Sequence, residues 1–216
     1  TNINLLTQIA DALALAIEKS RLFEETRRGD LILQALAFVS RKLLMPGDLD
    51  ETLQEVIAHL GRATGVTYVY FFENHFDNTK LNASMRYLWS DRAAYVEANP
   101  VDYQNYSYEG AGIRRWVPLL KQGFPIYGLT RDFPAGERLV LRKQSILSFA
   151  LVPIFVGDDW WGFLGFNDQT RERKWSLAEI EALKSVGGAF GAAFVRQKIE
   201  NAEREQRALT EALRDS

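Results

Sequence analysis

The feature of this sequence that most constrains its fold is a long helical pattern at the C-terminus. Ser176 and Glu179 have the spacing of a capping box, in which each side chain bonds a free backbone N–H at the start of a helix. Apolar residues then recur at steps of three and four, and no proline interrupts the pattern before Asp215. Such a helix extends about 55 Å at roughly 1.5 Å per residue. A single small domain cannot cover that length, so we expect the far half to pack on a partner chain or to lead into another domain.

A second helical pattern occupies the N-terminus. Leu6, Leu13 and Ile17 lie on an apolar stripe that follows alternating four- and three-residue steps. We expect this helix to continue past Gly29 to about Leu44. Because the first residue is not methionine and both ends have the pattern of mid-helix sequence, we expect a piece of a longer protein. The predicted domains are residues 1–30 as a linker helix, residues 31–198 as a globular domain, and residues 199–216 as a helix that leads to the next domain.

The middle of the chain alternates turn signals with strand patterns. A Pro-Gly pair at residues 46–47 ends the first helix. A capping pair, Asp48 and Glu51, begins another helix that runs to about Thr64. Runs of β-branched and aromatic residues then predict two β-hairpins, separated by an irregular, aromatic-rich region at residues 90–136. The predicted strands are residues 66–72, 81–89, 125–129, 148–156 and 160–166, and short helices are predicted at residues 113–121 and 137–144.

Three stretches carry a resemblance to a known family. They are the helix and turn at residues 53–65, the hairpin at residues 152–166, and the loop and helix start at residues 173–183. All three resemble the GAF domain, and the resemblance covers residues 31–198. Residues 5–25 resemble the last helix of a preceding GAF domain.

The resemblance implies an α/β fold of the α+β type. Its parts would be a central antiparallel sheet with helices on both faces, flanked by long N- and C-terminal signalling helices. These terminal helices would bundle on one face, with a pocket under the loops of the other face. The resemblance also implies a multi-domain bacterial sensor, of the kind found in histidine kinases and cyclic-dinucleotide enzymes.

The composition excludes several kinds of chemistry. The 216 residues contain no cysteine, which rules out disulfides, thiolate metal ligands, cysteine nucleophiles and covalent bilin attachment, so we predict no cofactor. Two histidines are too few for a histidine-rich metal site. A formal net charge of -2 gives no basic surface for nucleic acid, and no apolar run approaches the ~20 residues of a membrane span. We expect a cytoplasmic segment that neither binds nucleic acid nor inserts into a membrane.

No motif in the sequence predicts catalysis. Asp158 and Asp159 directly follow Gly157, which is typical of hairpin turn residues and not of a catalytic carboxylate pair. A phospho-accepting histidine and the Gly-rich nucleotide motifs of a histidine kinase are both missing. The segment is therefore predicted not to be an enzyme, while a catalytic domain outside it fits the resemblance.

Candidate ligand-binding residues are aromatic and basic. Arg115 and Trp116 suit an anionic, planar ligand through ion pairing and stacking, although a solvated helix face with one buried tryptophan explains them more simply. The nucleotide-binding signature of phosphodiesterase GAF domains is only partly present, because Asn167 and Glu179 match while Asp168 replaces its lysine. Six more candidates come from the elements that wall the pocket in GAF domains, and each of them would otherwise fill the core. These are Tyr70, Arg86, Tyr87, Trp89, Tyr127 and Arg131.

The terminal helices predict a parallel homodimer. The side chains expected at the dimer helices are Leu6, Leu13, Ile17, Leu183, Phe190 and Phe194. Glycines at residues 187, 188 and 191 indicate that another backbone approaches closely, either the sheet or a neighbouring helix. The leading hypothesis is a module that binds an unidentified small molecule and relays its state through the dimer. A ligand-free structural linker and a PAS-like sensor are the alternatives.

Overall fold

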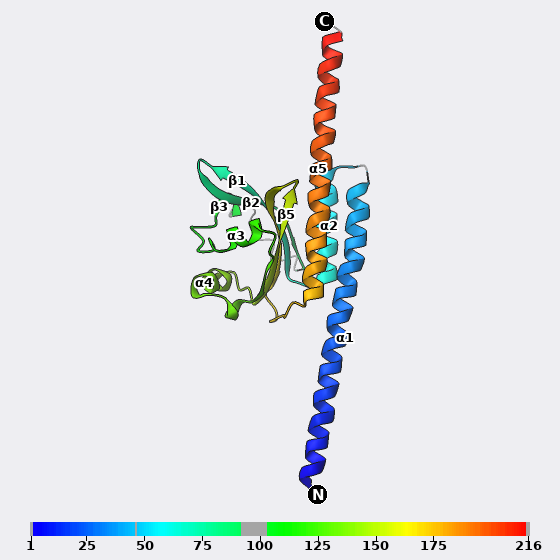
Figure 1. Ribbon diagram of the computed structural model, residues 1–216, viewed down its shortest axis with the longest axis vertical. Coiled ribbons are helices and arrows are strands. Elements are labelled where there is room, and N and C mark those ends of the chain that lie inside the picture. Colours follow the sequence, from blue (N-terminus) through cyan, green and yellow to red (C-terminus); the bar gives the residue numbers. More distant parts are fainter. Residues whose placement is uncertain (1, 46, 92–102, 215–216) are drawn as a thin grey trace.

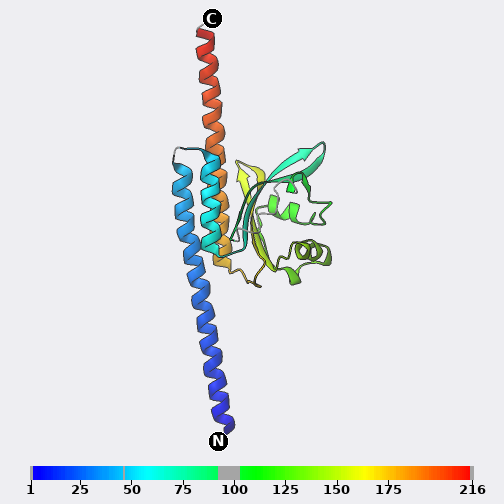
Figure 2. The same ribbon diagram turned by 180° about the vertical axis from the view of Figure 1, so that it is seen from behind.

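Two long helices determine the outline of the molecule (Figure 1). The computed structural model describes residues 2–45, 47–91 and 103–214. Helix α1 covers Asn2–Leu44 and helix α5 covers Leu177–Arg214. The predicted continuity of the first helix through Gly29 is confirmed, since one glycine costs a helix only about 1 kcal/mol relative to alanine. The free ends of the two helices point in opposite directions along one axis, and the globular part lies beside their overlap (Figure 1, Figure 2).

A six-stranded sheet forms the centre of the globular part, and its strand order is β3-β2-β1-β6-β5-β4. All neighbouring strands are antiparallel. Both predicted hairpins form, β1 with β2 and β5 with β6, and the sheet is completed by pairing of β1 with β6. The strands are β1 (Tyr68–Asp77), β2 (Lys80–Ser90), β3 (Tyr106–Ser107), β4 (Ile126–Leu129), β5 (Ser148–Val156) and β6 (Asp159–Asp168). The predicted fold class, an α+β fold around an antiparallel sheet, is confirmed.

Three helices cover one face of the sheet (Figure 2). Helix α2 (Leu49–Thr64) begins at Asp48, whose side chain accepts a hydrogen bond from the Glu51 N–H at 3.0 Å. It ends at Gly65, which is in the left-handed conformation with φ 63°. The second half of α1 and the first half of α5 pack beside it. The core on this face includes Ile32, Ala35, Val39, Leu53, Ile57, Phe71, Leu164, Phe166, Leu183 and Phe190.

Glycines let α5 approach the sheet closely. A Cβ added at Gly187 would lie 2.9 Å from the carbonyl oxygen of Pro153, and one added at Gly191 would lie 2.0 Å from that of Phe155. Both carbonyls belong to β5. Of the two explanations that the sequence leaves open for these residues, packing on the sheet therefore accounts for Gly187 and Gly191.

The opposite face of the sheet carries short elements. They are helix α3 (Trp116–Lys121), the 3-10 helix η3 (Thr130–Asp132) and helix α4 (Ala135–Lys143). The short helices predicted at residues 113–121 and 137–144 correspond to α3 and α4, and the strand predicted at residues 125–129 corresponds to β4. A second apolar core fills this side, and it includes Phe72, Met85, Tyr108, Ile113, Trp116, Leu120, Phe149 and Phe163.

Burial of the α5 side chains corrects part of the predicted dimer surface. Leu183 and Phe190 are 0% exposed, and the ring of Phe194 lies 4.5 Å from that of Trp161 on the sheet. The prediction that Leu183 and Phe190 face a second chain is therefore wrong, whereas the prediction for Phe194, which is partly buried, stays a prediction. The physical reason is that a sheet needs an apolar cover on each buried face, and here α5 supplies it.

The apolar residues predicted for the dimer surface of α1, unlike Leu183 and Phe190 of α5, are exposed. Leu6, Leu13 and Ile17 are 66%, 61% and 62% exposed. Apolar contacts of α1 with the core begin only at Ile32, and those of α5 end at Phe194. The predicted boundaries at residues 30/31 and 198/199 lie near these two points and stay predictions.

None of the described helices has the combination of length and apolar character that a membrane span needs.

Candidate functional site

A cavity of about 230 Å³ lies between the sheet and the short elements on the face opposite the long helices. Residues of α3, α4 and the segment around β3 form its roof, and residues of β1, β2, β5 and β6 form its floor. Most of its walls are aromatic. The aromatic lining residues are Tyr68, Tyr70, Phe72, Tyr103, Tyr106, Tyr108, Trp116, Phe149 and Phe163.

Strand alternation decides which side chains of the sheet reach the cavity. Successive residues of a strand point to opposite faces, so Tyr68, Tyr70 and Phe72 all line the cavity. On β6, Asn167 lines it as well. A Cβ added at Gly165 would come within 2.2 Å of the Tyr70 ring. The ring of Tyr70 therefore occupies the space that a larger residue at position 165 would need.

Two hydrogen bonds order the polar groups of the cavity wall. Tyr70 Oη donates to Asn167 Oδ1 at 2.9 Å, and Tyr108 Oη donates to Asn74 Oδ1 at 2.7 Å. Burial raises the pKa of Tyr70 and of Tyr108, so both phenols stay protonated at neutral pH. Asn167 is 6% exposed, and its amide nitrogen makes no hydrogen bond within the part of the chain that the structure describes.

Arg115 is held by an ion pair and does not line this cavity. Its Nε and Nη2 donate to the two carboxylate oxygens of Glu137, each at 2.8 Å. Burial alone would raise the pKa of Glu137, but the hydrogen bonds from Arg115 outweigh burial and lower it. The pair joins the segment before α3 to α4. Trp116, by contrast, lines the cavity, and its ring stacks on Phe149 with centroids 5.4 Å apart.

Three other predicted site residues lie on the helix-covered face. Tyr87, Trp89 and Tyr127 pack against the core beneath α1, α2 and α5. The Tyr87 hydroxyl donates to Asp50 of α2, and the ring of Trp89 lies against Gly61 of the same helix. The structure therefore does not bring these aromatic side chains to the cavity.

The two remaining predicted arginines are exposed and paired. Arg86 is the extra residue at an irregularity of the β1–β2 pairing, and its guanidinium pairs with Glu73. Arg131 pairs with Glu172. Of the eight predicted ligand-binding residues, the structure places Tyr70 and Trp116 in the wall of the cavity.

Several cavity residues are absent from the predicted set. Tyr103, Tyr106 and Tyr108 come from the irregular region, where no period exists from which a buried face could be assigned. The density of tyrosines there was the available signal. Asn167 matches one position of a nucleotide-binding signature, but nothing in the sequence indicates that it meets Tyr70.

A buried polar network continues from the cavity at the end of β6. Asp168, which follows Asn167, is 0% exposed and accepts hydrogen bonds from Thr170 and Arg171. Burial alone would raise the pKa of Asp168, but these hydrogen bonds outweigh burial and lower it. Arg171 also donates to the carbonyl oxygen of Gly65, at the end of α2, at 3.0 Å.

The network reaches the start of α5 through a buried ion pair. The side chains of Arg173 and Glu179 are 1% and 0% exposed. Arg173 also donates to the carbonyl oxygen of Thr64, and its guanidinium lies 4.1 Å from the ring centre of Trp175. Glu179 accepts from the Ser176 N–H at 2.8 Å, and its own N–H donates to Ser176 Oγ at 3.2 Å. The capping box predicted from the sequence is confirmed, and the ion pair fastens it to α2.

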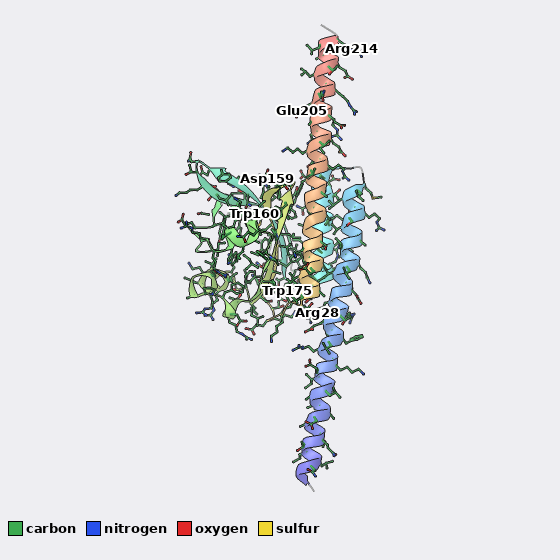
Figure 3. The ribbon with its side chains drawn as sticks, viewed as in Figure 1. Arg28, Asp159, Trp160, Trp175, Glu205 and Arg214 are labelled. Carbon is green, nitrogen blue, oxygen red and sulfur yellow. The ribbon has the colours of Figure 1, made fainter. Side chains whose placement is uncertain are left out.

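Side-chain contacts hold the helix layer together at both ends. At the end where α5 begins, near the labelled Trp175 and Arg28 in Figure 3, Arg173 bonds both Glu179 of α5 and the carbonyl oxygen of Thr64 in α2. At the other end, Arg196 of α5 donates to the carbonyl oxygen of Leu43 in the last turn of α1. Its Nε also lies 3.4 Å from Glu200 Oε1, one turn further along α5. A side chain of α5 thus bonds a terminal carbonyl of α1 where α5 leaves the globular part.

Comparison with known proteins finds a family and a relative. The family model described as GAF domain matches residues 48–194. The methanogenesis regulatory histidine kinase FilI of Methanothrix harundinacea (strain 6Ac) is 36% identical over 174 residues. These residues make up 81% of this chain and 20% of that protein, so the chain spans one fifth of the relative's length.

Solved structures share the fold. The far-red-absorbing dark state of a protein with bound biliverdin IXa has a TM-score of 0.62 at 17% identity, covering 76% of this chain and 99% of that chain. The phycoerythrobilin-bound GAF domain of a cyanobacterial phytochrome has a TM-score of 0.62 at 14% identity, with 80% and 97% covered. A domain of a two-component sensor histidine kinase protein from Sinorhizobium meliloti 1021 has a TM-score of 0.53 at 14% identity, with 74% and 99% covered. At these identities the likeness shows the fold alone.

Proposed function

Because the chain belongs to the GAF domain family, we propose that it is the regulatory sensor and relay module of a larger signalling protein. The observation that carries the proposal is the continuity between the cavity and α5. Asn167 lines the cavity, Asp168 follows it in the buried network, and Arg173 and Glu179 hold the start of α5. A ligand that shifts the end of β6 would bias the position of α5 if it binds two helix arrangements with different affinities.

The parent protein in this proposal is a histidine kinase that works in the cytoplasm. The relative FilI, a regulatory histidine kinase, supports this assignment. The segment itself would carry no catalytic step, and the kinase domain would lie beyond it. The family match favours a GAF sensor over the PAS-like alternative.

Signal transfer in this proposal runs through a parallel homodimer. Leu6, Leu13 and Ile17 give the free half of α1 an exposed apolar stripe at helical spacing. Helix α1 enters the helix layer and α5 leaves it along the same axis (Figure 1). Pairing of two copies along this axis would connect an upstream domain to a downstream one without crossing the sheet.

The ligand in this proposal is a small molecule held without a covalent bond. Its site would be the cavity of about 230 Å³. The bilins bound by two of the similar structures do not transfer to this chain as thioether-linked groups, because the chain has no cysteine. A structural linker with no ligand is the competing proposal.

Spin labels test the relay without any ligand. The chain has no cysteine, so Gln206→Cys places one label on the free half of α5 in each subunit. Leu88 lines the cavity, and Leu88→Trp fills part of it. We expect Leu88→Trp to shift the label-to-label distance distribution, measured by pulsed electron double resonance. Adding Arg173→Met should abolish that shift, because it cuts the link to α5.

Leu139→Trp is the matched control, since Leu139 is 57% exposed on α4 and lies outside the cavity. It should leave the distances unchanged. Circular dichroism confirms that each variant is folded. Identical distances in the parent and in Leu88→Trp would favour the structural linker, and a monomer at high concentration by light scattering would contradict the dimer.

A further inference from the structure

The walls of the cavity favour a ring compound. Tyr70, Tyr106, Trp116, Phe149 and Phe163 reach it from β1, β3, α3, β5 and β6. Aromatic side chains pack against the faces and edges of other rings at little entropic cost. The volume of about 230 Å³ is below the ~300–1,000 Å³ of pockets for drug-sized ligands. The space suits one or two fused rings.

The charges around the cavity favour an uncharged ligand. Among the described residues that line it, Lys143 is the single Asp, Glu, Lys or Arg, and Lys143 is exposed. Burial raises the pKa of Tyr70, Tyr106 and Tyr108, so these phenols stay neutral. A charged group carried inward would lose its hydration and find no counter-ion. An ion pair with exposed Lys143 would be worth little in return.

One polar group is positioned to orient the ligand. Asn167 is only 6% exposed, and its Oδ1 accepts the 2.9 Å hydrogen bond from Tyr70. Its amide N–H groups have no partner within the described residues. The buried side-chain atoms that lack a partner in the described part of the chain do not include Asn167 Nδ2, so this nitrogen is open to the cavity. A ligand acceptor placed there would take the place of water and gain a direct hydrogen bond.

We infer that the cavity binds a compact, uncharged, flat compound of one or two fused rings that presents a hydrogen-bond acceptor to Asn167. This inference rests on the proposed sensor function and names the class of its ligand. It separates this cavity from sites for tetrapyrroles, which carry carboxylates and are larger, and from sites for cyclic nucleotides, whose phosphate needs a cation.

Three probes of similar shape test the inference. Quinoline has a ring-nitrogen acceptor, naphthalene has none, and quinoline-2-carboxylate adds a charge. Dissociation constants are measured by isothermal titration calorimetry, and the Asn167 side-chain amide signals are followed by ¹⁵N nuclear magnetic resonance. We expect quinoline to bind at least about tenfold more tightly than either other probe and to shift the Asn167 signals.

Variants then assign the preference to named atoms. Asn167→Leu keeps the size of the side chain and removes the donor, so it should abolish the preference for quinoline over naphthalene. Tyr70→Phe keeps the ring and removes the phenol that orients the amide, so it should reduce the preference. Tyr87→Phe, on the opposite face of the sheet, is the control and should leave the preference for quinoline over naphthalene unchanged.

Three outcomes would overturn the inference. They are equal or tighter binding of the carboxylate, a preference that survives in folded Asn167→Leu, and no binding of quinoline at millimolar concentration to folded protein. The relay is judged separately, because the Leu88→Trp distance measurement needs no ligand. If that measurement succeeds while quinoline fails, the ligand class is wrong and the sensor proposal stands.

Discussion

Glycines in the packed half of α5 differ in what surrounds them. A Cβ added at Gly188 meets nothing within 4 Å, whereas one added at Gly191 would lie 2.0 Å from the Phe155 carbonyl oxygen. We expect Gly188→Ala to raise the free energy of unfolding by about 0.5–1 kcal/mol, because alanine is the better helix former. Gly191→Ala should lower it, because α5 must move away from the sheet. Urea unfolding measures both, and a stabilising effect of both alanines would contradict the packing described here.

Asp168 contributes stability that depends on pH. The hydrogen bonds from Thr170 and Arg171 hold the pKa of Asp168 below its ordinary value of about 3.9. The folded protein therefore binds fewer protons than the unfolded chain at acid pH. The stabilisation is fully present above that ordinary value and is lost as the pH falls through the lower folded-state pKa.

We expect Asp168→Asn to lower the free energy of unfolding at neutral pH and to flatten its dependence on pH below about 4. Urea unfolding over a pH series measures both effects. Asp158→Asn, at an exposed turn, is the control and should match the parent protein. An Asp168→Asn variant with the parent's acid sensitivity would show that other groups determine it.

Elements were predicted well where their signals are local. The capping residues Asp48 and Ser176 both begin helices as expected, because a cap depends on side chains only three residues apart. Both hairpins follow from strand patterns that flank a turn. The pairing of β1 with β6 was not predicted, because these strands lie far apart in the sequence, and the resemblance implied only a central antiparallel sheet.

The capping box of α5 yields a prediction at this scale. Ser176→Ala removes the acceptor of the Glu179 N–H, so we expect a loss of about 1 kcal/mol in the free energy of unfolding. Ser185→Ala is the matched control, because its hydroxyl bonds the carbonyl of Glu181 on an exposed face within the same helix. That variant should be neutral or slightly stabilising. Equal losses in the two variants, measured by urea unfolding, would argue against the cap.

At the scale of the whole molecule, α5 and α1 use their apolar residues differently. Phe190 fills the core, whereas Leu13 is exposed on the free half of α1. We expect Leu13→Glu to shift the proposed dimer toward monomer in light scattering, with little change in the thermal unfolding of the globular part. Phe190→Ala should do the opposite and cost about 3–5 kcal/mol of stability. A Leu13→Glu protein that remains dimeric would place the dimer contact elsewhere.

The sequence by itself determined the features that depend on neighbours along the chain: the two long helices, their caps, the two hairpins and the absence of cysteine chemistry. The tertiary structure alone decided which faces those elements present. The extra residue Arg86 separates Met85, which faces the cavity, from Tyr87, which faces the helices. Tyr70 and Asn167, 97 positions apart, meet only because β1 pairs with β6. A strand pattern fixes alternation, but strand register and the partner across the sheet decide what each side chain touches.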